Sequence, residues 1–203
     1  MTKNNTTLGY SGLIHEAVDK FYGMHNEMHS YRVSKVIRQH AALSALAGGA
    51  TAALPATGAA IGLGVHIGSV YAMYIRMSKE MGIKLKGNVL KTLGSVMIGN
   101  IAGNLAGYIV ASFASLVPVG GSIVATVSVA GANYASAVVC GMCYGKAIVS
   151  LTRRGKKVSD LSEEELKNAI NSEFKKTDFK EAVKKYGAEY DRAHGCKGKV
   201  VLV

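Results

Sequence analysis

The chain has 203 residues, of which 18% are charged, and its formal net charge is +11. Its length predicts a single domain with at most an appendage, and its three cysteines, an odd number, do not fit a disulfide framework. The basic residues gather at the borders of apolar runs, without interleaved aromatic residues or a helix-turn-helix pattern, so the charge does not predict a nucleic-acid partner.

The N-terminal region combines a polar tail with a predicted amphipathic helix. Residues 1–10 lack the apolar core and the cleavage site of a secretory signal, so we expect a cytoplasmic location or the cytoplasmic face of a membrane. Residues 13–47 have apolar positions at helical spacing and charges on the other face. His25 and His29 have the spacing of a metal pair, but no further ligand is fixed and a solvated helix face is favoured.

Residues 41–75 form a first apolar stretch without Asp, Glu, Lys or Arg. Pro55 divides it into two predicted helices, and His66 is the only histidine in the second half. Gly58 and Gly62 stand four residues apart, as do Gly64 and Gly68, which predicts a helix face for close packing. Residues 62–68 also come near a dinucleotide-binding loop, but no convincing strand precedes them. A basic, glycine-punctuated connector follows at residues 80–88.

Residues 92–145 contain no Asp, Glu, Lys, Arg or His, and this run is the most informative feature of the chain. Such a run must be buried on nearly every side, in a membrane or in a self-packed bundle. Pro118, Gly120 and Gly121 predict a turn that divides it into two helical arms, residues 93–117 and 122–145. Each arm of about 25 residues would be roughly 38 Å long, enough to cross a hydrocarbon core of about 30 Å.

The composition of the two arms weakens the case for spanning a membrane. Glycine, serine and asparagine residues offset much of the insertion free energy of the Leu, Ile, Val and Phe residues. Gly99, Gly103 and Gly107 would line one face of the first arm and let another helix approach. The hairpin could therefore insert as a pair of helices or form the core of an assembly.

Basic residues flank this run on both sides. Lys84, Lys86 and Lys91 precede it, and Arg153, Arg154, Lys156 and Lys157 follow it. We expect both flanks to face the cytoplasm and to contact anionic headgroups, the alternative being a solvated basic surface.

The end of the run and the C-terminal region carry three further local patterns. Cys140 and Cys143 have C-x-x-C spacing but lie late in an apolar helix, which favours two buried thiols over a redox pair. Residues 141–147 lack the glycine spacing and the hydroxyl of a phosphate-binding loop. Ser162 with Glu165 predicts the start of one charged helix, and Asp178 the start of another.

The order of these segments resembles a known family. Arg38 to Ala42 leads into a Gly/Ala-rich stretch ending at Pro55, an amphipathic segment ends in residues 79–83, and Val117 to Gly121 forms the hairpin turn. Over about residues 36–151 this arrangement is similar to the helical domain called domain of unknown function 697. The resemblance implies a membrane-associated domain, often attached to or encoded near small GTPases, and it provides no catalytic residues.

We therefore expect an all-α, Gly/Ala-rich bundle with a polar tail (1–10), a helical domain (11–151) that contains the hairpin (92–145), and a charged appendage (152–203). The expected function is that of a non-enzymatic, membrane-associated, self-assembling scaffold. It would bind anionic lipids, form a homo-oligomer and serve a small GTPase, with no cofactor, metal or nucleic acid. The alternatives are a soluble helical interaction module whose hairpin is the buried core, and a pore-forming effector.

Overall fold

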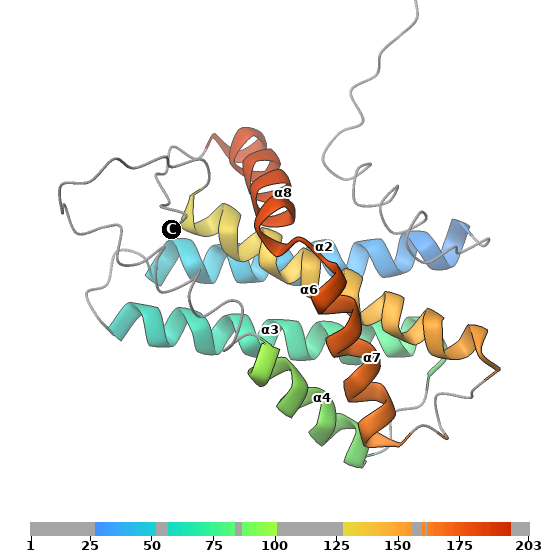
Figure 1. The fold of residues 1–203 in the computed structure, drawn as a ribbon. Helices are drawn as coiled ribbons and strands as arrows, with labels where there is room; N and C mark the ends of the chain where they lie inside the picture. Colours follow the sequence, from blue (N-terminus) through green and yellow to red (C-terminus); the bar gives the residue numbers. More distant parts are fainter. Residues whose placement is uncertain are drawn as a thin grey trace, which may run out of the picture.

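The computed structural model describes residues 27–51, 57–83, 87–100, 128–155, 160 and 162–195. Within these ranges the chain is helical and contains no strand, which confirms the predicted all-α fold. The helices in Figure 1 are α2 (Glu27–Thr51), α3 (Thr57–Glu80), α4 (Gly87–Asn100), α6 (Val129–Arg153), α7 (Glu163–Lys176) and α8 (Phe179–His194). The polar tail, the predicted hairpin turn and the first arm beyond Asn100 lie outside the described residues.

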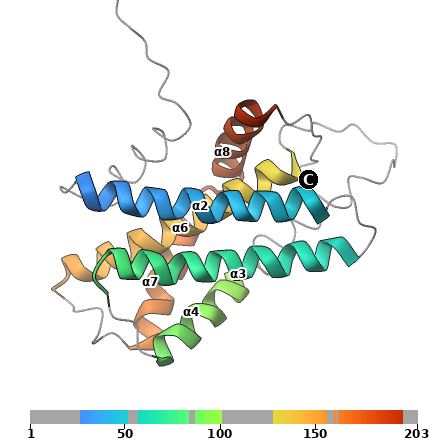
Figure 2. The same cartoon turned by 180° about the vertical axis from the view of Figure 1, so that it is seen from behind.

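Helix α6 is the centre of the described structure. Helices α2 and α3 run antiparallel and lie on one side of α6, whereas α7 and α8 lie on the other (Figures 1 and 2). Helix α4 packs against α3 and α7. Among the described helices, α6 is the one long and apolar enough to cross a membrane, but 78% of its most apolar 18-residue window is buried inside the protein. Its neighbours therefore provide the burial that its composition requires.

Small residues let α6 be surrounded so closely. A Cβ atom added at Gly141 would lie 2.9 Å from Cγ1 of Ile37 in α2 and 3.2 Å from Cε of Met73 in α3. Larger side chains fill the space on either side, and the rings of Tyr74 and Tyr144 stack with their centroids 4.3 Å apart. The buried residues of α2, α3, α6, α7 and α8 form one continuous hydrophobic core.

The two predicted arms differ from the helices that contain them. The second arm corresponds to α6, which begins at Val129 and continues past Gly145 to Arg153. The first arm begins inside α4, which starts earlier, at Gly87. Because residues 101–127 are not described, the pairing of the two arms as a hairpin stays a prediction. The predicted break near Pro55 is matched by the end of α2 at Thr51 and the start of α3 at Thr57.

The caps of the C-terminal helices follow the sequence. The backbone N–H of Glu165 donates to Ser162 Oγ at 3.2 Å, and the backbone N–H of Ser162 donates to Glu165 Oε2 at 3.0 Å, which completes a capping box. Asp178 caps α8 by accepting a hydrogen bond from the backbone N–H of Glu181 at 3.0 Å.

Helices α7 and α8 belong to the same core as α6. They bury Leu166, Ile170, Phe174, Val183, Tyr186 and Tyr190. Asp191 of α8 also accepts hydrogen bonds from the backbone N–H and the hydroxyl of Ser128, the residue that caps α6. The predicted boundary at residue 152 therefore does not separate two hydrophobic cores.

Candidate membrane-contact surface and buried polar contacts

Exposed apolar side chains gather on α2 and α3. All the large exposed hydrophobic residues of the described chain lie on these two helices: Tyr31, Leu43, Leu46, Ile61, Val65 and Ile75. All but Tyr31 fall within the charge-free residues 41–75, and Leu46 is 66% exposed. We call Leu43, Leu46, Ile61, Val65 and Ile75 the apolar face.

The helical periodicity of α2 and α3 explains why these side chains point outward. The inner side of each helix is occupied by core residues such as Ile37 and Ala41 in α2 and Val70 and Met73 in α3. With no charged residue between positions 41 and 75, the outer side must also be apolar or small. Figure 2 views the molecule from this side, and no other described helix lies in front of α2 and α3.

A basic end adjoins the apolar face. The N-terminal half of α2 carries exposed Arg32 and Lys35, and the C-terminal end of α3 carries exposed Arg76 and Lys79. The antiparallel arrangement brings these two ends together, and Arg32 Nη1 lies 3.8 Å from Glu80 Oε2. Arg76 Nη2 donates to Gln39 Oε1 at 3.0 Å. The α2–α3 pair therefore has one charge-free end and one basic end.

The C-terminal end of α6 lies at this same basic end, as the two opposite views in Figures 1 and 2 agree. Exposed Arg153 and Arg154, two residues of the predicted basic flank, are located there. Lys91 is exposed on α4. The other residues of the predicted flanks, Lys84, Lys86, Lys156 and Lys157, lie outside the described residues. Contact of the flanks with headgroups stays a prediction.

Buried polar groups join α3 to its neighbours. His66 is fully buried, and its Nε2 lies 2.9 Å from Ser136 Oγ of α6, while its Nδ1 has no partner among the described residues. Burial lowers the pKa of His66 to about 4, so the imidazole is neutral. Ser69 Oγ donates to the carbonyl oxygen of His40 at 2.9 Å, and burial, followed by the nearby Arg76 guanidinium, lowers the pKa of His40.

The predicted packing glycines are only partly described. A Cβ atom added at Gly99, Gly64 or Gly68 would meet nothing within 4 Å. Gly62 is buried in α3, and Gly58 lies in the same helix. Gly103, Gly107, Pro118, Gly120 and Gly121 lie outside the described residues, so the glycine face of the first arm stays a prediction.

Two other glycines make close helix approaches instead: Gly141, against Ile37 and Met73, and Gly48 of α2, where an added Cβ atom would overlap the Asn133 side chain of α6. Gly145 stands four residues after Gly141, but the sequence could not show this approach, because the partners Ile37 and Met73 are distant in the sequence.

The described residues contain no group of His, Cys, Asp and Glu side chains that could hold a metal ion. His25 lies outside them, and the surroundings of the His29 side chain are not described. Cys140 and Cys143 are buried in the middle of α6, where burial raises the pKa of Cys143 to about 11 and that of Cys140 further. Neither thiol is therefore a thiolate at neutral pH, in keeping with the expected buried pair.

Both glycine-rich near-motifs are helical. Residues 62–68 lie within α3 and residues 141–147 within α6, so neither forms a phosphate-binding loop. No family model, no curated protein and no solved structure matches the chain. The resemblance to domain of unknown function 697 stays a prediction.

Proposed function

We propose that the protein is a non-enzymatic scaffold that attaches to the cytoplasmic surface of a membrane through the apolar face of α2 and α3. The observation that carries this proposal is the concentration of exposed apolar side chains on a stretch without charged residues. Monomeric soluble proteins rarely expose apolar residues together in this way unless they bind a membrane or another protein. The adjoining basic end favours an anionic membrane as the partner.

The energetics favour reversible attachment. Each half-exposed apolar side chain contributes about 1 kcal/mol when it enters an apolar medium, so the five together contribute about 5 kcal/mol. That is comparable to a single acyl anchor, which holds a protein only marginally. Each basic residue near an anionic surface adds about 1 kcal/mol. Attachment should therefore need both the apolar contacts and the electrostatic attraction, and it should weaken as salt screens the charges.

The burial of α6 argues for peripheral attachment over insertion. To cross a bilayer, α6 would have to leave its contacts with α2, α3, α7 and α8. It would also break the hydrogen bonds that join Ser136 to His66 and Ser128 to Asp191. Peripheral contact through the apolar face leaves all of these in place, so it is the less costly mode.

Self-assembly through the same face is the second candidate function. Gly64 and Gly68 lie exposed beside Ile61 and Val65, with open space where a side chain would be. Small residues next to branched apolar ones let two helices pack closely. This contact could form in solution, as in the soluble-module alternative, or on the membrane. A small GTPase, implied by the family resemblance, is the partner that we propose such an assembly would serve.

Liposome flotation at low and high salt tests the proposal. The wild-type protein should float with vesicles containing anionic phosphatidylserine at low salt, and less so at high salt or with neutral vesicles. The double variant Leu46→Gln, Val65→Gln should lose most of this binding, because it removes about 2 kcal/mol of apolar contact, a factor of about 30. Ala193→Gln, an exposed position on α8, is the control and should bind as the wild type does.

Two results would contradict membrane attachment by this face. One is wild-type protein that stays at the bottom of the gradient under all conditions. The other is full binding by the double variant. Light scattering on the same proteins tests the second candidate, since a dimer that the double variant converts to a monomer would identify the face as a protein interface instead.

A further inference from the structure

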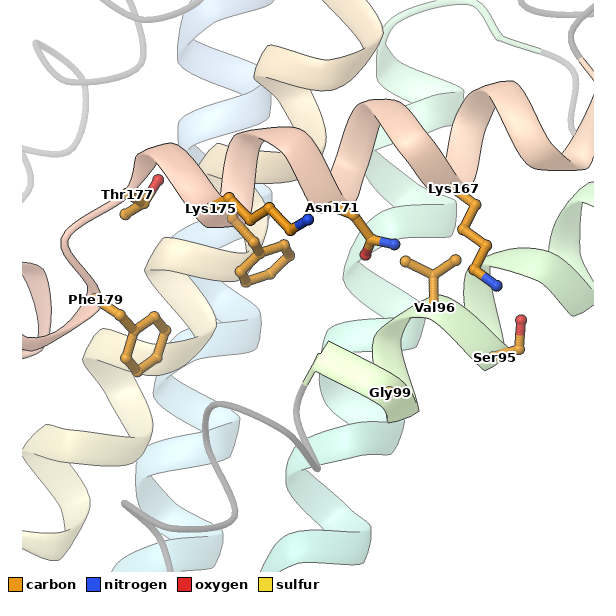
Figure 3. A pocket seen from close by; sticks show the side chains of 9 residues that line it. Ser95, Val96, Gly99, Lys167, Asn171, Lys175, Thr177 and Phe179 are labelled. Carbon is orange, nitrogen blue, oxygen red and sulfur yellow. The ribbon is translucent and has the colours of Figure 1, made fainter.

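A cleft of about 590 Å³ lies between α4 and α7 (Figure 3), and it shares no residue with the apolar face. Its volume is within the range of small-molecule sites, which is about 300 to 1,000 Å³. One wall is polar and belongs to α7, whereas Val96 and Gly99 of α4 form part of the opposite wall.

The polar wall is a row of side chains on one face of α7. Lys167, Asn171 and Lys175 are four residues apart, so they lie one above another along the helix. In Figure 3 the Lys175 side chain extends back towards Asn171, and the Asn171 amide points into the space between the helices. The two lysine Cα atoms are roughly 12 Å apart along the helix axis, so their long side chains can reach one anion placed near Asn171.

The charge of this row is not neutralised by its surroundings. No Asp or Glu lines the cleft, and neither Lys167 nor Lys175 forms an ion pair with a described carboxylate. Glu173 pairs with Lys176 at 2.7 Å, and Glu163 and Glu164, one turn before Lys167 on α7, do not line the cleft. The cleft therefore presents two ammonium groups to any ligand that enters it.

Apolar surface continues the cleft beyond the lysines. Phe174, which is buried against the core, Phe179 at the start of α8 and Val96 of α4 all line the cleft. Gly99 also lines the cleft, and nothing lies within 4 Å of where a Cβ atom at this position would be. The site thus combines a cationic row with an apolar pocket.

We propose that this cleft binds an anionic amphiphile, a carboxylate or phosphate group attached to a short hydrocarbon chain. The anion is held between the two lysines, and the chain packs on Val96, Phe174 and Phe179. A free fatty acid and a bilayer phospholipid share this chemistry. The proposal uses none of the residues of the apolar face, so it stands or falls independently of membrane attachment by α2 and α3.

Titration of the full-length protein with decanoate, below its micelle concentration, tests the proposal by amide chemical shifts. Saturable binding should shift the amides of Gly99, Asn171 and Lys175. Decyltrimethylammonium, which has the same chain and the opposite charge, and acetate, which lacks the chain, should each bind at least about tenfold more weakly, since each loses one of the two sources of affinity.

Two variants separate the halves of the site. The double variant Lys167→Gln, Lys175→Gln should bind decanoate about 25-fold more weakly, at about fivefold for each exposed ion pair. Gly99→Leu should fill the apolar pocket and weaken binding without disturbing the fold, because the position is open. Lys184→Gln with Arg192→Gln removes the same charge from exposed positions of α8 and should bind as the wild type does.

Equal binding of the cationic amphiphile, or unchanged binding by the Lys167, Lys175 variant, would overturn the proposal. So would decanoate shifts confined to α2 and α3. If decanoate competes with flotation on anionic vesicles, the natural ligand is a bilayer lipid. If flotation is indifferent to decanoate that binds the cleft, the ligand is a free amphiphile.

Discussion

The buried imidazole of His66 makes the fold sensitive to acid. Its pKa is about 4 in the folded protein and 6.5 in the unfolded chain, so the unfolded chain binds a proton first as the pH falls. The stability associated with the neutral form is present above about pH 6.5 and is lost progressively towards pH 4. Between about pH 7 and pH 5 the loss should amount to about 2 kcal/mol.

Urea unfolding at these two pH values measures this loss. The wild type should lose stability on acidification, and His66→Gln should lose about 2 kcal/mol less over the same interval, whatever its stability at neutral pH. His40→Gln is the comparison, because the pKa of His40 is lowered for the same reason and the sign of its effect is the same. An equal pH dependence in the wild type and His66→Gln would show that His66 is not a buried neutral imidazole.

Two glycines on helices should respond in opposite ways to alanine. At Gly141 the new methyl group would meet Ile37 at 2.9 Å, so Gly141→Ala should destabilise the protein by about 1 to 3 kcal/mol despite its better helix propensity. At Gly64 the methyl group meets nothing within 4 Å, so Gly64→Ala should stabilise it by about 0.5 to 1 kcal/mol. Thermal unfolding of both variants measures the difference. A stabilising Gly141→Ala would mean that α6 does not lie against α2 and α3 as described.

At the scale of the elements, the start of α6 depends on a residue of α8. Asp191 accepts hydrogen bonds from the N–H and the hydroxyl of Ser128, and Ser128 Oγ accepts one from the backbone N–H of Gly131 at 2.9 Å. A carboxylate at a helix N-terminus also interacts favourably with the helix dipole. The pair therefore joins the last described helix to the first turn of the central one.

Asp191→Ala should cost about 1 to 3 kcal/mol, because it leaves the buried Ser128 groups without their acceptor. Asp191→Asn keeps one acceptor oxygen and the shape of the side chain, and should cost about half as much. Hydrogen exchange of the first turn of α6 is the local measurement, and it should accelerate in the order wild type, Asn, Ala. If exchange in that turn is the same in all three proteins, Asp191 does not stabilise the α6 cap.

The sequence predicted where helices begin and end better than it predicted which helices pack against one another. Ser162 with Glu165, Asp178 and the break at Pro55 are local signals, and the helices begin and end where these signals indicate. The absence of charge from residues 92–145 showed that the second arm must be buried, but it could not show what buries it. The many charged residues of α7 and α8 indicated solvent-exposed helices, whereas the apolar sides of both helices pack against α6.

The candidate sites were harder to predict for the same reason. The apolar face of residues 41–75 is interrupted by glycine and alanine, so its hydropathy is modest and its exposure emerges only when the inner sides of α2 and α3 are seen to be occupied. The row of Lys167, Asn171 and Lys175 can be read from α7 alone, but the approach of α4 that turns it into a cleft depends on contacts distant in the sequence.

The described structure as a whole has three regions of distinct polarity. The apolar helix α6 is enclosed, the apolar face of α2 and α3 is open, and basic residues of α2, α3 and α6 lie together at one end. An apolar face next to a basic end matches the layered polarity of an anionic membrane surface, where hydrocarbon lies beneath charged headgroups. The proposed lipid contact is therefore on residues 41–75, whereas α6 is enclosed by its neighbours.

Photolabelling from within the bilayer tests this location most directly. The full-length protein is bound to anionic vesicles that contain a phospholipid with a diazirine on its acyl chain, irradiated, digested and mapped by mass spectrometry. The account predicts lipid adducts on Leu43, Leu46, Ile61 and Val65, with α6 unlabelled. Adducts concentrated between Val129 and Arg153 would contradict it, because they would show that the bundle opens and α6 enters the membrane.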